Sequence, residues 1–150
     1  MTIPERVSEV QARIAAACER AGRDRAEVIL VAVAKGFPPD AVRAALEAGI
    51  ADIGENRAQE LKEKAAVLGD RPRWHFVGHL QTNKVRQVVG AVSLIHSVDR
   101  YGLAEAIARR AQSLGIVQGI LVEVNLGGER SKERSSVKAG TCRSFLIAGL

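Results

Sequence analysis

Short apolar runs alternate with helical segments along the first 125 residues, and this order limits the fold more than any other feature. The most apolar run, V-I-L-V-A-V-A at residues 28–34, is continuous and rich in β-branched residues, which is typical of a strand buried on both faces. The same patterns predict strands at residues 28–34, 51–54, 73–77, 93–98 and 119–125. They predict helices at residues 2–21, 38–48, 56–68, 82–89 and 101–114. Strands that alternate with helices indicate βαβ units and a parallel sheet.

The spacing between strand starts is fairly regular, which favours a closed barrel over a doubly wound sheet. No G-x-G-x-x-G sequence follows the first strand, so a dinucleotide-binding fold is disfavoured. We therefore expect an α/β fold of the (β/α)8 TIM-barrel type. A complete barrel of this type has eight strands and typically about 250 residues. This chain of 150 residues is expected to supply about the first five strands plus an N-terminal helix.

The composition changes abruptly after residue 129. Residues 130–150 contain five basic residues and one acidic residue, and account for +4 of the net charge of +5. We expect two parts, a partial barrel at residues 1–129 and an irregular basic tail at residues 130–150. Because the body is nearly neutral, the basic balance does not indicate a nucleic-acid partner. One hypothesis is that the tail is out-of-frame translation or a truncated gene model, which would fail if a shifted reading of the DNA restored no barrel-like sequence.

The cysteines and the hydropathy of the sequence predict the cellular compartment of the protein. Cys18 and Cys142 are isolated and lack C-x-x-C spacing, so they suggest neither zinc nor a redox pair and fit a reducing compartment. The N-terminus lacks a basic region followed by an apolar stretch. The apolar run at 28–34 is far shorter than the roughly 20 residues that span a bilayer. We expect a cytoplasmic protein without a membrane partner.

Lys35 follows the most apolar strand. Side chains alternate along a strand, so Val31, Val33 and Lys35 share a face. Active sites of parallel barrels gather at the C-terminal ends of the strands. A lysine there can lose part of its solvation, which lowers its pKa and frees the amine to form an imine with an aldehyde. The alternative is a solvated lysine that only marks the strand end.

Polar residues lie at other strand ends. Asn56 is either the N-cap of the next helix or a polar group directed at a ligand. Asn125 ends the fifth expected strand, at the position equivalent to Lys35 on the first. His75 and His79 are four residues apart, but their segment is a strand and turn without H-E-x-x-H, so we expect no metal site.

Five segments together resemble one family. They are V-A-V-A-K at 31–35, G-E-N-R-A-Q-E at 54–60, W-H-F-V-G-H-L-Q-T-N-K at 74–84, H-S-V-D at 96–99 and V-N-L-G-G-E at 124–129. Their order and spacing resemble the pyridoxal phosphate homeostasis proteins, small barrels like the N-terminal domain of alanine racemase. The resemblance runs from the first helix to residue 129.

The resemblance implies a single barrel that holds pyridoxal 5′-phosphate (PLP) as a Schiff base on Lys35, with Asn56 and Asn125 at the cofactor mouth. It implies no catalytic activity, a role in vitamin B6 homeostasis, and PLP-dependent apoenzymes as partners. The region from the last strands that holds the cofactor phosphate in this family has no counterpart here. A PLP-dependent racemase, a basic interaction module using the tail, and a non-functional fragment are the alternatives. A racemase would require a second acid/base group and usually a second domain, and the sequence shows neither.

Overall fold

The computed structural model describes residues 1–123 and 145–149, the second range by its backbone. The helices are α1 (Ile3–Arg20), α2 (Pro39–Glu47), α3 (Ala58–Leu68), α4 (Val85–Val88) and α5 (Tyr101–Ser113), with short 3-10 turns η1 (Arg25–Glu27) and η2 (Thr82–Lys84). The strands are β1 (Ile29–Val33), β2 (Asp52–Glu55), β3 (Arg73–Phe76), β4 (Leu94–Val98), β5 (Gly119–Val122) and β6 (Phe145–Gly149). Each strand and helix expected within residues 1–123 is present, with ends shifted by a few residues and η2 replacing the first turn of the fourth helix.

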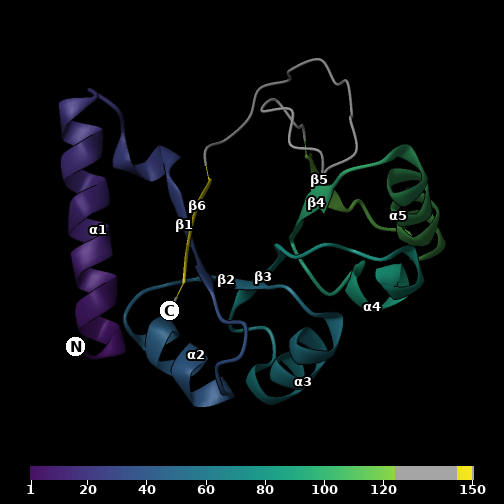
Figure 1. Ribbon diagram of the computed structural model, residues 1–150, viewed down its shortest axis with the longest axis horizontal. Helices are drawn as coiled ribbons and strands as arrows, with labels where there is room; N and C mark the ends of the chain where they lie inside the picture. The colour runs from purple at the N-terminus through teal and green to yellow at the C-terminus, as the bar shows by residue number, and fades with distance from the viewer. Residues whose placement is uncertain (124–144, 150) are drawn as a thin grey trace, which may run out of the picture.

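The strands form one parallel sheet in the order β5-β4-β3-β2-β1-β6. Val33 of β1 lies opposite Gly54 of β2, which in turn lies opposite His75 of β3. Figure 1 shows the strands along a curved path with the helices on its outer side. This is part of a (β/α) barrel, as the alternation of strands and helices predicts.

The first helix begins with a capping box. Thr2 accepts a hydrogen bond from the Glu5 N–H, and the Glu5 carboxylate accepts one from the Thr2 N–H at 2.7 Å. These two bonds satisfy backbone N–H groups that a helix start leaves without partners. The buried residues of α1 are Val7, Ile14 and Cys18, whose spacing puts them on one face. That face packs the helix onto the rest of the fold, next to α2.

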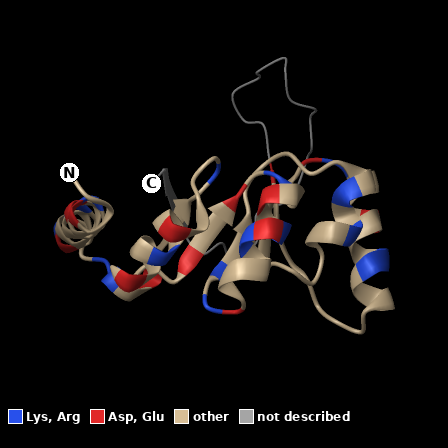
Figure 2. Cartoon of the chain, turned by 90° about the horizontal axis from the view of Figure 1, so that it is seen from below, with Lys and Arg blue, Asp and Glu red and all other residues tan. Residues whose placement is uncertain are grey.

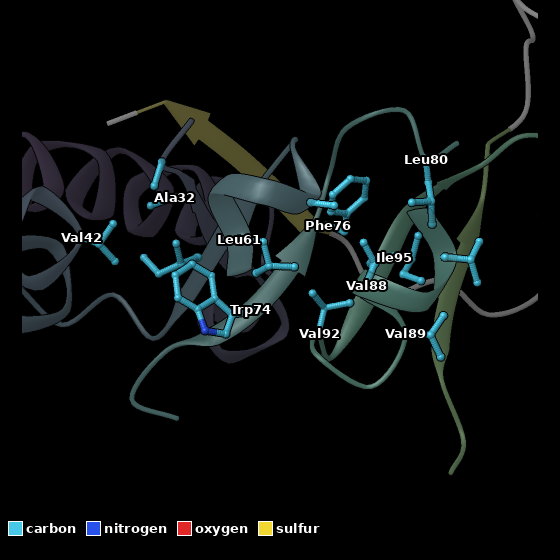
Figure 3. Close-up of a cluster of buried hydrophobic side chains, with 14 of the residues drawn as sticks. Ala32, Val42, Leu61, Trp74, Phe76, Leu80, Val88, Val89, Val92 and Ile95 are labelled. Carbon is cyan, nitrogen blue, oxygen red and sulfur yellow. The ribbon is translucent and has the colours of Figure 1, made fainter. Parts of the chain in front are cut away.

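The hydrophobic core lies between the sheet and the helices. Alternate residues of β1 to β4 contribute one side of it, namely Ala32, Ile53, Phe76 and Ile95, and the helices contribute Val42, Leu61, Val88 and Leu103. Figure 3 shows this cluster extending from Val42 and Ala32 at one end to Leu80 and Val89 at the other. The opposite sheet face carries Val31, Asp52, Gly54 and His75, which the barrel geometry turns toward the interior.

The expected irregular tail is corrected over its last residues. We expected no regular structure in residues 130–150, but residues 145–149 form β6, which pairs in parallel with all five residues of β1. The physical reason is that the apolar segment F-L-I-A-G can pair with N–H and C=O groups at the edge of β1. The earlier part of the predicted tail, residues 130–144, lies outside the described residues.

The surface of the described helices carries both signs of charge. Figure 2 shows Lys and Arg residues interspersed with Asp and Glu residues over the helices. Among the helices that the structure describes, none is long and apolar enough to cross a membrane.

Candidate functional site

Lys35 lies on a tight turn directly after β1. The turn is closed by a hydrogen bond from the Phe37 N–H to the Ala34 C=O at 3.1 Å. Gly36 has a φ of 74°, a backbone conformation that residues other than glycine rarely adopt. The Lys35 side chain is exposed, which agrees with the alternative of a solvated lysine at the strand end and not with the loss of solvation that such a position allows. The reason is that Lys35 lies beyond the last strand residue, on the turn itself, and not within the sheet.

Asn56 lies at the end of β2, the neighbouring strand. Val33 pairs with Gly54, so Lys35 and Asn56 each lie two residues beyond this last pair, after the C-terminal ends of adjacent strands. The helix that follows begins at Ala58, and its N-cap is Arg57, so the alternative that Asn56 caps the helix is wrong. The Oδ1 atom of Asn56 is buried and has no hydrogen-bond partner among the described residues. A buried polar atom without a partner is uncommon in proteins and is consistent with a group that a ligand completes.

A cavity of about 280 Å³ opens beside Asn56. Its walls come from the start of α3, from the end of β3 and from the segment that leads into α4. The lining residues are Asn56, Arg57, Ala58, Gln59, Phe76, His79, Leu80, Gln81 and Lys84. The W-H-F-V-G-H-L-Q-T-N-K segment therefore contributes five of the nine lining residues.

Gly78 allows these two segments to approach each other. A Cβ atom at this position would lie 2.3 Å from the Asn56 backbone oxygen and 2.6 Å from the Asn56 Cα. Such contacts are closer than atoms can approach, so the turn after β3 can pack against the turn after β2 only with glycine here. The glycine in the distinctive segment thus shapes the wall of the cavity.

A buried ion pair lies under the Lys35 turn. Lys64 of α3 donates to Glu55 of β2 with an Nζ–Oε1 distance of 2.5 Å, and their side chains are 6% and 0% exposed. Burial raises the pKa of Glu55, and the hydrogen bond and charge of Lys64 act in the opposite direction. The net direction is upward, so the environment of this carboxyl favours the protonated form more than water does.

A second polar cluster joins β2, β3 and β4 on the interior face of the sheet. Asp52 accepts hydrogen bonds from Arg73 at 2.9 and 2.7 Å and lies 2.9 Å from Nε2 of His75. The Nδ1 atom of His75 lies 2.9 Å from Nε2 of His96. Burial raises the pKa of Asp52, but the hydrogen bonds of His75 and Arg73 outweigh it and lower the pKa to about 2. Burial and the neighbouring His75 lower the pKa of His96 to about 4.

The structure brings some predicted residues together and separates others. Lys35 and Asn56 lie at the ends of adjacent strands, while Asn125 lies outside the described residues. His75 is buried in the sheet, whereas the His79 side chain is 63% exposed and its Nδ1 lies 3.5 Å from Asp99. Within residues 1–123, no group of three or more His, Cys, Asp or Glu residues could hold a metal ion.

Sequence reasoning assigned no role to the buried charged residues. For Lys64 a signal was present, because it falls three residues after Leu61 and four before Leu68, on the apolar stripe of α3. A lysine in that stripe requires an anionic or polar partner inside the protein. For Asp52 and His96 there was no comparable signal, because their partners lie on strands about 20 residues away in the sequence.

Comparisons with known proteins identify relatives of this chain. A protein of Aquifex aeolicus named "Pyridoxal phosphate homeostasis protein" is 47% identical over 133 residues, which are 88% of this chain and 58% of that protein. A protein of the same name from Pseudomonas aeruginosa is 42% identical over 132 residues, which are 87% of this chain and 57% of that protein. Over most of its length, the chain is thus similar to proteins named pyridoxal phosphate homeostasis protein. No family model matches the chain.

Solved structures of similar proteins agree with the fold. An unknown protein from Bifidobacterium adolescentis is 41% identical and matches with a TM-score of 0.82, over 88% of this chain and 58% of the other. PipY of Synechococcus elongatus with PLP bound is 37% identical and matches with a TM-score of 0.72, over 85% of this chain and 56% of PipY. The chain thus spans somewhat more than half the length of the relatives that it matches.

Proposed function

We propose that this chain binds PLP covalently through Lys35 and serves vitamin B6 homeostasis by holding the cofactor without catalysing a reaction. Supporting this, the exposed Lys35 and Asn56 follow the C-terminal ends of the adjacent strands β1 and β2. The relatives of the chain are named pyridoxal phosphate homeostasis proteins. The PLP bound in the structure of PipY supports the choice of cofactor.

The residues at this edge fit the aldehyde end of such a cofactor. The Lys35 side chain is exposed, so its amine can reach a small molecule without a rearrangement of the core. PLP would supply an aldehyde, and Lys35 would hold it through its amine as an imine, with the aldehyde oxygen released as water. The buried Oδ1 of Asn56 offers a hydrogen-bond acceptor after the end of the adjacent strand.

The role of the whole protein is part of the same proposal. We infer that the protein works in the cytoplasm and passes PLP to apoenzymes that depend on it. Asn125 is proposed as a third residue at the cofactor mouth, on the basis of the family resemblance. The boundary near residue 129, and an out-of-frame origin of the sequence that follows it, stay predictions.

Covalent labelling tests the role of Lys35. The purified chain is mixed with PLP, the imine absorbance is recorded, and the bond is then reduced with borohydride so that mass spectrometry can locate the adduct. We expect the adduct mainly at Lys35 and loss of most of the absorbance in Lys35→Ala. Lys62→Ala, which removes an exposed lysine of α3, is the matched control and is expected to behave like the parent.

Two results would contradict the proposal. Absorbance that is equal in Lys35→Ala and the parent would show that PLP reacts with surface lysines in general. Racemisation of an amino acid above the buffer rate by the PLP-loaded protein, lost in Lys35→Ala, would instead indicate an enzyme. Transfer of PLP from the loaded protein to an apoenzyme, measured by recovery of that enzyme's activity, tests the delivery step.

A further inference from the structure

Side chains of α3 hold the backbone on both sides of Lys35. The Nζ atom of Lys64 donates to the Ala34 C=O at 2.6 Å, and the Gly36 N–H donates to Oε2 of Glu60 at 2.8 Å. The two bonds therefore join the residues directly before and after Lys35 to the next βα unit, which is 24 to 30 residues further along the chain. Two hydrogen bonds from α3 therefore hold the turn that carries Lys35.

The side chains of Glu60 and Lys64 also form ion pairs, together with Glu55. The Lys64 Nζ lies between Glu55, at 2.5 Å, and Glu60, at 3.5 Å. The side chains of Glu55, Lys64 and Glu60 are 0%, 6% and 21% exposed, so the cation is enclosed between two carboxylates under the turn. Buried charges of this kind persist only when they are paired and hydrogen-bonded, which fixes their positions.

The charge state of Glu60 suits an acceptor role at neutral pH. The hydrogen bond from the Gly36 N–H holds the pKa of Glu60 below its usual range, although burial acts in the opposite direction, and Lys64 adds to the lowering. An ionised carboxylate accepts a stronger hydrogen bond from a backbone N–H than a neutral group does. Glu60 also lies in the first turn of α3, where a negative charge is favourable.

We propose that Glu60 and Lys64 are positioning residues that hold the Lys35 turn in the conformation that binds the cofactor. This inference rests on the proposed function of Lys35 as the residue that bonds to PLP. A turn that is already ordered avoids the loss of conformational entropy that binding would otherwise require. Neither residue touches the cofactor in this proposal, and both act through the backbone that flanks Lys35.

Variants of Glu60 separate positioning from general stability. Glu60→Ala removes the acceptor of the Gly36 N–H, whereas Glu60→Gln keeps an acceptor oxygen at the same place. Glu63→Ala is the matched control, because it removes an exposed carboxylate of the same helix. Glu63 accepts a hydrogen bond from Gln59 and makes none to the turn. The probe is PLP at a concentration below saturation, followed by borohydride reduction and measurement of the adduct at Lys35 relative to Lys62.

We expect Glu60→Ala to lower the ratio of Lys35 to Lys62 adduct about tenfold, the effect of losing one hydrogen bond to a charged group. Glu60→Gln is expected to retain most of the ratio, and Glu63→Ala to match the parent. Glu60→Ala is expected to stay folded and to unfold only a few degrees below Glu63→Ala, about the effect of one lost hydrogen bond. Amide exchange of the Gly36 N–H, measured without PLP, is expected to be faster in Glu60→Ala.

The outcomes distinguish the inference from the function on which it rests. A parent ratio well above one that is unchanged in Glu60→Ala would overturn the positioning role and leave the function of Lys35 intact. A fall in Glu60→Gln as large as that in Glu60→Ala would also overturn it, because the hydrogen bond would then not be the cause. A parent chain that labels Lys35 no more than Lys62 would overturn the proposed function, and the positioning role with it.

Discussion

The buried carboxylate of Asp52 is expected to make the stability of the fold depend on acid pH. Its side chain is 9% exposed and accepts hydrogen bonds from His75 and Arg73, whose side chains are 4% and 63% exposed. Burial alone would raise the pKa of Asp52, but the hydrogen bonds, first that of His75 and then that of Arg73, bring it to about 2. Because Arg73 is largely in solvent, its contribution is screened by water and salt, and His75 is the stronger partner.

The magnitude follows from the difference in proton affinity between the folded and unfolded chain. The pKa of Asp52 falls from 3.8 to about 2, and a tenfold change in affinity corresponds to about 1.4 kcal/mol. The group therefore contributes about 2 kcal/mol to the free energy of unfolding at neutral pH. Because the folded-state pKa is the lower one, this contribution is present above about pH 4 and is lost as the pH falls through about 2.

Urea unfolding of the parent and Asp52→Asn tests this reasoning. At neutral pH we expect the variant to be less stable by about 2 kcal/mol, and the difference to close between about pH 4 and pH 2. Asp70→Asn, which changes an exposed carboxylate in the turn after α3, is expected to track the parent throughout. A difference between parent and Asp52→Asn that stays constant down to about pH 2 would refute the argument, because the variant would then act through packing and not through charge.

Two further predictions concern the turn after β3 and the buried ion pair. Gly78→Ala is expected to destabilise the fold by about 2–3 kcal/mol because its Cβ would overlap the Asn56 backbone. Gly102→Ala, whose Cβ meets no atom within 4 Å in α5, is expected to stabilise by about 0.5–1 kcal/mol, and thermal unfolding measures both. Lys64→Met is expected to cost about 3–5 kcal/mol at neutral pH because it leaves the Glu55 charge buried and unpaired. Adding Glu55→Gln is expected to recover most of that loss in urea unfolding, and a double variant no more stable than Lys64→Met would contradict this account.

The positions of Lys35 and Asn56 could be predicted from the sequence because they depend on local patterns. A short β-branched run specifies a strand, the following turn residues end it, and parallel strands bring their C-terminal ends to one edge. Two residues that each follow a strand must therefore lie near each other if the strands are neighbours. The structure pairs β1 with β2 in parallel, with Val33 opposite Gly54, so Lys35 and Asn56 both follow the C-terminal ends of adjacent strands.

The exposure of Lys35 and the role of Asn56 could not be read from the same patterns. Whether a residue at a strand end is covered depends on how far the turn extends beyond the sheet, and here Lys35 lies on the turn. From the sequence spacing alone, either Asn56 or the next residue could be the N-cap of α3. Only the backbone conformation shows that the N-cap is Arg57.

The sequence by itself determined a parallel α/β fold with Lys35 at the edge where the strands end, because strand and helix periods are properties of a few adjacent residues. Only the tertiary structure decided what surrounds that edge. The pairing of Lys64 with Ala34 and Glu55, the contact of Asp52 with His75, and the addition of β6 beside β1 all join segments that are distant in the chain. Such contacts depend on strand order and register, which the pattern of one segment does not contain. For this reason the sequence did not show that Glu60 and Lys64 bind the backbone on both sides of Lys35.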